Sequence, residues 1–273
     1  MLSNIFAPIV EATLNPEKHP EISEFLKKVV AFDFVSDEEK NEKIKSYSDY
    51  KKVSPEEWTC NEDPTYSYWN YYIYANLTAL NHLRRSKGLN TFAYRPHCGE
   101  TGRNDHLGTG YLLAHSISHG LGLSKITVLQ YLFYINQIGI SMSPLSNSKN
   151  FMKFLKNPFL KYFTRGLNVS LSSDDPLSIH LTKEPLMEEY SVAAQTLNLN
   201  AVDLCEIARN SVLQSGFSFK KKKNWLGERF YEGGNYPEKS NFSQIRFSYR
   251  SETFIEERKY IERHAYNQEE IGQ

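Results

Sequence analysis

Cysteine is scarce in this chain of 273 residues, and its three cysteines lie far apart without a Cys-x-x-Cys pair. An even disulfide framework is therefore excluded, and the pattern is typical of reduced thiols in a cytosolic protein. Net charge is also absent, because 32 basic residues balance 32 acidic ones. No global field favours nucleic acid or an anionic membrane, so neither is expected as a partner. The sequence further lacks any His-x-His.

No targeting or membrane-spanning segment is evident in the sequence. Residues 1–10 are apolar, but they lack a basic start and a small-residue cleavage site, and Glu11 interrupts the run. Residues 126–148 carry no charge, yet Gln130 and Pro144 make a bilayer helix a poor interpretation. We expect a buried helix followed by a buried strand there, in a protein of the cytosol.

Short apolar runs alternate with helix-like segments along most of the chain. The aromatic fraction of 14% and hydrophobic fraction of 40% are those of a packed globular protein. Strands are expected at 29–34, 91–95, just before 119, at 138–142 and at 167–171. Helices are expected at 23–30, 66–85, 105–116, 128–137, up to about 164, and at 184–197 and 201–215. This alternation predicts an α/β fold with a parallel sheet, and polar residues after each strand are typical of a (β/α)₈ barrel.

The first polar motif is Arg95-Pro96-His97-Cys98-Gly99-Glu100, at the end of an expected strand. Gly99 would let the chain turn, so that His97 and Glu100 face one pocket. His97 could then bind a metal while Glu100 exchanges a proton with a substrate. For this spacing alone, a surface turn is the commoner interpretation.

Two further motifs follow later strands, Ser118-His119-Gly120 and Ser172-Ser173-Asp174-Asp175-Pro176. His119 stands where a base that orients water would lie, although a lone histidine is more often structural. Of the two aspartates, one can bind a metal while the other holds substrate or water. The alternative is a helix N-cap before Pro176, a favoured first helical residue.

Other features favour structural interpretations. Lys220–Lys223 is expected to be a solvated basic turn, and the Tyr-rich segment 66–74 to be core. Gly120-Leu121-Gly122 lacks the context of a dinucleotide loop. Nothing near Cys98 marks it as an activated nucleophile.

Taken in this order and spacing, the motifs resemble the adenosine/AMP deaminase family, and eukaryotic AMP deaminases in particular. The resemblance runs from about Phe6 to about Arg250. The supporting segments are Tyr74-Ala75-Asn76-Leu77, Arg85-Ser86-Lys87-Gly88, Val128-Leu129-Gln130-Tyr131-Leu132, Met142-Ser143-Pro144-Leu145-Ser146-Asn147, Leu181–Tyr190 and Asp203–Val212.

This resemblance implies a zinc-dependent (β/α)₈ hydrolase that converts AMP to IMP and ammonia. His97 and Asp174 match zinc ligands of the family, Glu100 matches the acid that protonates purine N1, and His119 matches the base that activates the zinc water. The substrate-contacting residues would be Glu100, Asp175, Pro176, Leu177 and Ser178.

The resemblance also has gaps. The family's His-x-His, which supplies two more ligands, and its phosphate-gripping segment have no counterpart in this sequence. One zinc ion would have two of four expected ligands, and about strands 4 to 8 of the barrel would be present. We expect an incomplete barrel over 1–219, and a helical extension with a polar tail over 220–273.

Two hypotheses explain the gaps. The chain is the C-terminal part of an AMP deaminase, with Met1 an internal or misassigned start, or it is a truncated, non-catalytic paralogue. In the first case it would associate with a missing N-terminal half. In the second it would bind deaminase subunits or other partners. The family resemblance implies a homo-oligomer, typically a tetramer.

Overall fold

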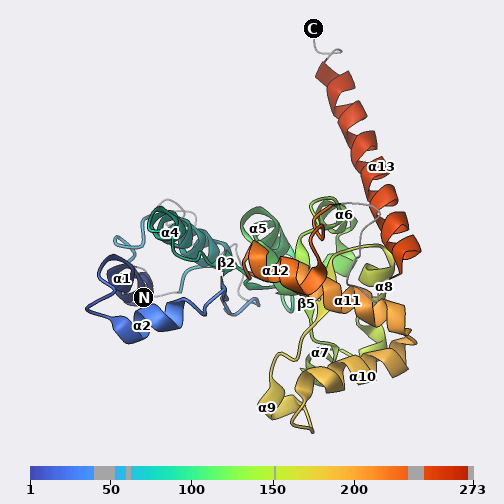
Figure 1. Ribbon diagram of the computed structural model, residues 1–273, viewed down its shortest axis with the longest axis horizontal. Helices are drawn as coiled ribbons and strands as arrows, with labels where there is room; N and C mark the ends of the chain where they lie inside the picture. The colour runs from blue at the N-terminus through green and yellow to red at the C-terminus, as the bar shows by residue number, and fades with distance from the viewer. Residues whose placement is uncertain (40–52, 60–62, 151, 233–242, 270–273) are drawn as a thin grey trace. The chain divides into compact units, whose positions relative to one another are not determined.

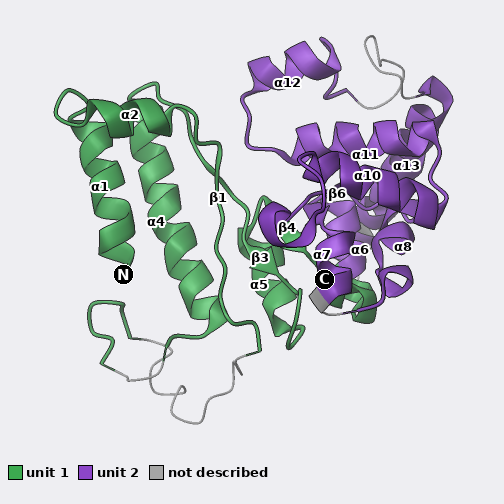
Figure 2. Ribbon diagram, turned by 90° about the horizontal axis from the view of Figure 1, so that it is seen from below, with its two compact units in different colours: residues 1–129 green, residues 130–273 purple. Residues whose placement is uncertain are grey.

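The computed structural model describes residues 1–39, 53–59, 63–150, 152–232 and 243–269 (Figure 1). The chain divides into two compact units, residues 1–129 and 130–273 (Figure 2). Each unit pairs parallel strands and covers them with helices, which confirms the expected α/β class. Among the helices of the described ranges, none is long and apolar enough to cross a membrane.

The described residues of unit 1 form two parallel pairs of short strands. Its elements are α1 (Leu2–Leu14), α2 (Pro20–Leu26), β1 (Ala31–Phe32), α4 (Tyr66–Ser86), β2 (Ala93–Tyr94), β3 (His97–Cys98), α5 (Asp105–Leu113), β4 (Ser116–His119) and the 3₁₀ turn η1 (Leu121–Lys125). β1 pairs with β2, and Ala31 lies opposite Ala93. β3 pairs with β4, and His97 lies opposite Ser118.

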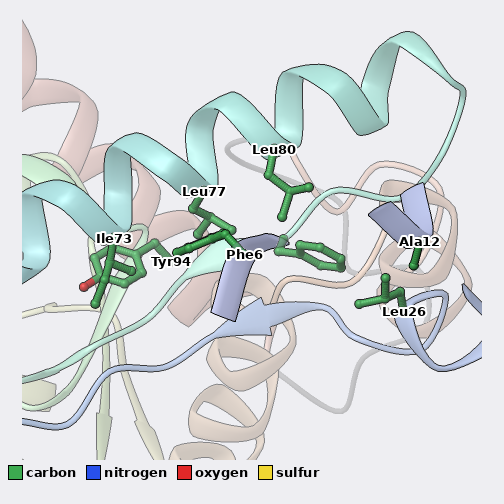
Figure 3. Packing of buried hydrophobic residues seen from close by; sticks show 8 residues of the cluster. Phe6, Ala12, Leu26, Ile73, Leu77, Leu80 and Tyr94 are labelled. Carbon is green, nitrogen blue, oxygen red and sulfur yellow. The ribbon is translucent and has the colours of Figure 1, made fainter. Parts of the chain in front are cut away.

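The long helix α4 organises the core of unit 1. Ile73, Leu77 and Leu80 recur at helical spacing and form one buried face. This face packs with Phe6 from α1 and Tyr94 from β2 (Figure 3). The helix begins where the Thr65 side chain accepts a hydrogen bond from the N–H of Tyr68, and it ends after Arg84 and Arg85.

Arg84 ties α1 to the end of α4. Its side chain is buried, with the guanidinium 4.5 Å from the centre of the Phe92 ring. It donates hydrogen bonds to Thr13 Oγ1 at 3.1 Å and to the carbonyl oxygen and side chain of Asn90 at 2.7 and 2.8 Å. A buried cation needs such partners, so this network stabilises the docking of α1.

Unit 2 is built around one parallel pair of fully buried strands. Its elements are α6 (Thr127–Ile135), which crosses the unit boundary, β5 (Gly139–Met142), α7 (Pro144–Asn150), the 3₁₀ turn η2 (Phe154–Lys156), α8 (Phe159–Thr164), β6 (Val169–Leu171), α9 (Pro176–Ile179), α10 (Pro185–Leu197), α11 (Ala201–Gln214), α12 (Phe219–Leu226) and α13 (Gln244–Glu269). β5 pairs with β6, with Ile140 opposite Val169. α11 packs on both strands, and Asn210 donates to the carbonyl of Val169 at 3.1 Å.

Most predicted elements are present, and several differ from the expectation. The expected strand 91–95 is the shorter β2, and a separate strand, β3, begins after Pro96, which cannot donate a ladder hydrogen bond. The predicted basic turn Lys220–Lys223 lies within helix α12, which the Ser218 side chain caps. The predicted helix 23–30 is the shorter α2, and α1 was not predicted at all. Residues 36–57 form a charged stretch whose sequence predicts a surface segment; they lie partly outside the described residues, and Glu38 within them is buried.

We predict that Leu77→Ala lowers the free energy of unfolding by about 2–5 kcal/mol, because it leaves a cavity against Phe6 and Tyr94. Denaturant titration followed by circular dichroism measures this change. The matched control is Leu112→Ala on α5, where the side chain is 76% exposed and a change within about 0.5 kcal/mol is expected. Equal effects of the two substitutions would contradict this core.

Candidate functional site

Three predicted site residues come together in unit 1. Parallel pairing places Cys98 of β3 opposite His119 of β4, so the imidazoles of His97 and His119 lie with their ring centres 4.9 Å apart. The Glu100 carboxylate lies 3.3 Å from His119 Nδ1. His119 is buried, whereas His97 and Glu100 are partly exposed. One face of this unit therefore carries two imidazoles and a carboxylate.

Gly99 makes this grouping possible. Its φ of +69° lies in the left-handed region, and a Cβ there would lie 2.5 Å from Leu107 Cδ2. Glycine is the residue that meets both conditions without strain. The turn follows β3 at once and brings Glu100 back towards the histidines, as the sequence predicts.

His119 and Asp174 share an uncommon backbone conformation. Among the described residues, four that are not glycine have positive φ, and these two are among them, at +71° and +55°. Each comes at or just after the end of a strand, β4 or β6. Left-handed conformations are unfavourable for most residues with a Cβ, and they occur often at functional sites. Backbone conformation and side-chain type therefore both single out His119 and Asp174 as candidate site residues.

Asp33 is a site residue that the sequence reasoning missed. Its Oδ1 lies 3.0 Å from His97 Nδ1, and it follows directly after β1. Metal-binding histidines commonly direct one ring nitrogen to a carboxylate in this way, which fixes the ring and its tautomer. The available signal was its place after an apolar strand, the same signal that identified the other motifs.

Asp174 is held within unit 2 by a serine. Ser146 Oγ donates to Asp174 Oδ2 at 2.6 Å, a short hydrogen bond to a charged oxygen. Ser146 is buried in α7, which begins just after β5. In the sequence, Ser146 belongs to a segment that resembles the family, and nothing local indicates this contact. This contact fixes the orientation of a carboxylate that was predicted as a metal ligand.

The residues after Asp174 are largely exposed. Asp175 occupies the N-cap position of α9 and Pro176 its first position, but the Asp175 side chain makes no capping hydrogen bond. Leu177 is fully exposed, and the Ser178 carbonyl accepts from Lys149 Nζ at 2.8 Å. Asp175 is therefore the N-cap residue of α9 by its backbone position only. Its carboxylate does not cap the helix and is exposed.

A buried His–Glu pair lies behind this loop in unit 2. His180 Nε2 and Glu189 Oε1 are 3.2 Å apart, and neither side chain is exposed. Glu189 also accepts a hydrogen bond from the N–H of Leu145 at 3.3 Å, and this contact connects α10 to the start of α7. Burial raises the pKa of the Glu189 carboxyl to about 8, and the charge of Asp174 adds to this. The weak sequence signal was a glutamate four residues before Ala193, on the buried face of α10.

Cys98 is excluded as a nucleophile, as expected. It is fully buried, and burial raises the pKa of its thiol to about 12. A thiol of that pKa is not ionised near neutral pH. The chemistry that unit 1 can perform therefore rests on its imidazoles and carboxylates, which can bind a metal and exchange protons.

Comparison with known proteins gives consistent matches. The family model described as AMP deaminase matches residues 1–267. AMP deaminase 1 of Mus musculus is 52% identical over 260 residues, which cover 94% of this chain and 35% of that protein. The AMP deaminase of Dictyostelium discoideum is 52% identical over 257 residues, 94% of this chain and 32% of that protein. The chain thus spans about a third of the length of these relatives.

Among solved structures, Arabidopsis ADAL in complex with IMP is 15% identical, with a TM-score of 0.49. The match covers 78% of this chain and 52% of that chain. Adenine deaminase from Arthrobacter aurescens is 21% identical, with a TM-score of 0.46 over 56% of this chain and 46% of that chain.

Glu189 generates a prediction about pH. Since its pKa is about 8 in the folded chain and near 4.5 in the unfolded one, the folded state binds more protons between these values. The stability that this group contributes is therefore lost as pH rises from 5 to 8. In Glu189→Gln this loss disappears. Between pH 5 and pH 8, the change in the free energy of unfolding should therefore differ between the two proteins by at least about 1 kcal/mol.

Urea titrations at pH 5, 6, 7 and 8 measure the effect. Glu184→Gln is the matched control, because Glu184 is exposed at the start of the same helix and caps nothing. Identical slopes for the wild type and Glu189→Gln would contradict the raised pKa.

Proposed function

Because the chain belongs to the AMP deaminase family, we propose that it carries part of an enzyme that hydrolyses AMP to IMP and ammonia. The relatives named AMP deaminase match nearly all of this chain at about half identity. The observation that carries the proposal is the grouping of His97, Glu100 and His119 in unit 1, at the positions that match the family's motifs. Because the chain spans about a third of these relatives, the complete activity requires further segments.

We propose that His97 and Asp174 are two ligands of one zinc ion. The donor set fits, since His97, His119 and Asp174 are side chains of the kinds that hold a metal ion. The Asp33 carboxylate at His97 Nδ1 and the Ser146 hydroxyl at Asp174 supply the outer contacts that orient such ligands. Bound zinc supplies Lewis-acid activation of water near neutral pH. A His-x-His pair from outside these 273 residues would complete the four ligands.

The remaining motif residues act on protons and substrate in this proposal. His119 accepts the proton of the attacking water, and Glu100 delivers a proton to purine N1 as water adds to C6. The bond between C6 and its amino nitrogen then breaks, ammonia leaves with the proton that His119 had taken, and the new C6 hydroxyl returns a proton to Glu100 as it becomes the carbonyl of IMP. Their separation of 3.3 Å keeps the base and the acid oriented towards each other. The substrate-contacting residues besides Glu100 are Asp175, Pro176, Leu177 and Ser178, and their exposure in unit 2 leaves them accessible to a ligand.

The architecture follows from the same proposal. The strand pairs of the two units are parts of one (β/α)₈ barrel, about strands 4 to 8, within residues 1–219. Residues 220–273 form an extension to it, and the protein works in the cytosol as a homo-oligomer. Support comes from the parallel pairing within each unit and from polar residues after the strands.

A non-catalytic role is the alternative. In that case the chain would bind deaminase subunits without turnover. The two functions differ in one observable, which is IMP formation when a segment bearing His-x-His is supplied to the chain.

We predict that Glu100→Gln lowers kcat for AMP by about 100- to 10,000-fold in the chain completed by such a segment, because the amide cannot deliver the proton. IMP formation by chromatography and ammonia release measure the rate. Glu21→Gln, an exposed site on α2, serves as the control and should match the wild type. Failure of the completed wild type to form IMP would favour the non-catalytic role, and full activity of Glu100→Gln would contradict the assigned acid.

A further inference from the structure

Glu38 reaches into the turn that carries Glu100. Its Oε2 accepts the N–H of Glu100 at 2.8 Å and the N–H of Thr101 at 3.2 Å, and the N–H of Gly99 also faces this carboxylate. One carboxylate thus satisfies successive backbone donors of a single turn. Backbone N–H groups that converge in this way form a concave site for an anion.

The chain around Glu38 is seated directly on the same turn. A Cβ at Gly102 would overlap the carbonyl oxygen of Glu38 and would lie 3.0 Å from the Cα of Glu39. Gly102 also has a φ of +64°, so a larger residue there would be strained and would displace the segment. Side chain and backbone of Glu38 therefore both contact residues 99–102.

The position of Glu38 is costly unless the turn compensates for it. Its side chain is 5% exposed, and burial raises the pKa of its carboxyl. Hydrogen bonds from backbone N–H groups to a carboxylate are among the stronger ones in proteins, and here they offset part of the loss of solvation. Removing the carboxylate would leave the N–H groups of Glu100 and Thr101 without this acceptor.

We propose that Glu38 is a positioning residue, which fixes the Gly99–Thr101 turn so that the Glu100 carboxylate stays beside His119. The inference rests on the proposed function, in which Glu100 delivers the proton to the substrate. Glu38 itself touches no reacting atom in this scheme. It acts through the backbone of Glu100, whose carboxylate lies 3.3 Å from His119 Nδ1.

Amide hydrogen exchange on the 273-residue chain tests the contact without any need for activity. Glu38→Ala should speed exchange at Glu100 and Thr101 by about tenfold or more, because their acceptor is gone. Glu38→Gln should restore most of the protection, because its amide oxygen can accept the same hydrogen bonds. Glu39→Ala, at the exposed neighbouring residue, should leave both amides unchanged.

The effect on catalysis is measured as kcat and KM for AMP. The assay uses whichever preparation deaminates AMP, either the chain alone or the chain with a His-x-His segment. Glu38→Ala should lower kcat by about 10- to 100-fold with little change in KM, since a misplaced proton donor affects the reaction more than binding. Glu38→Gln should recover most of this loss, and Glu39→Ala should behave as wild type.

The outcomes separate the two proposals. Unchanged exchange at Glu100 and Thr101 in Glu38→Ala overturns the positioning role, whatever the activity. Faster exchange with an unchanged kcat also overturns it, because the turn would then move without consequence. If every wild-type preparation fails to deaminate AMP, the proposed function falls, and the exchange data alone decide whether Glu38 holds the turn.

Discussion

Parallel strand pairing directs the carboxyl ends of neighbouring strands the same way, and the chemistry of each unit depends on that constraint. In unit 1, Asp33 follows β1, Glu100 follows β3 and His119 ends β4. In unit 2, Ser146 follows β5 and Asp174 follows β6. Each strand is short and contributes little area by itself, so helices α4 and α11 supply the packing that keeps the pairs aligned. Polar side chains thereby gather at strand ends while apolar ones face the helices.

Tight backbone turns after the strands also determine where the polar side chains lie. The left-handed conformation redirects the chain at Gly99 and His119, where β3 and β4 end, and at Asp174, three residues after β6. Two backbone segments after strands also accept support from buried carboxylates: Glu38 accepts hydrogen bonds from the turn after β3, and Glu189 accepts one from the start of α7, after β5. Glu38 and Glu189, which supply these two contacts, are themselves buried, whereas the Asp33 carboxylate beside His97 is exposed.

The sequence was sufficient for the motifs and for most elements, because apolar runs followed by Gly, His or Asp are local signals. The sequence was insufficient for the residues that contact those motifs. Nothing local links Glu38 to the amide of Glu100, or Ser146 to Asp174, since these contacts join residues 62 and 28 positions apart.

Helix α1 was not predicted because it has no side-chain cap and contains Pro8, and its stability comes from packing on α4. Strand lengths were overestimated, because hydrophobicity extends beyond the paired residues. The domain boundary and the roles of the site residues stay predictions.

Zinc content is the most direct test of the central claim, that this chain carries half of a zinc site in an AMP deaminase. Equilibrium dialysis of the 273-residue chain should give well under one zinc per chain, because two ligands of four bind weakly. Adding a segment that bears His-x-His should raise the content to about one zinc per chain, and His97→Ala should abolish the increase. One tightly bound zinc on the chain alone, or an increase that His97→Ala leaves intact, would contradict the account.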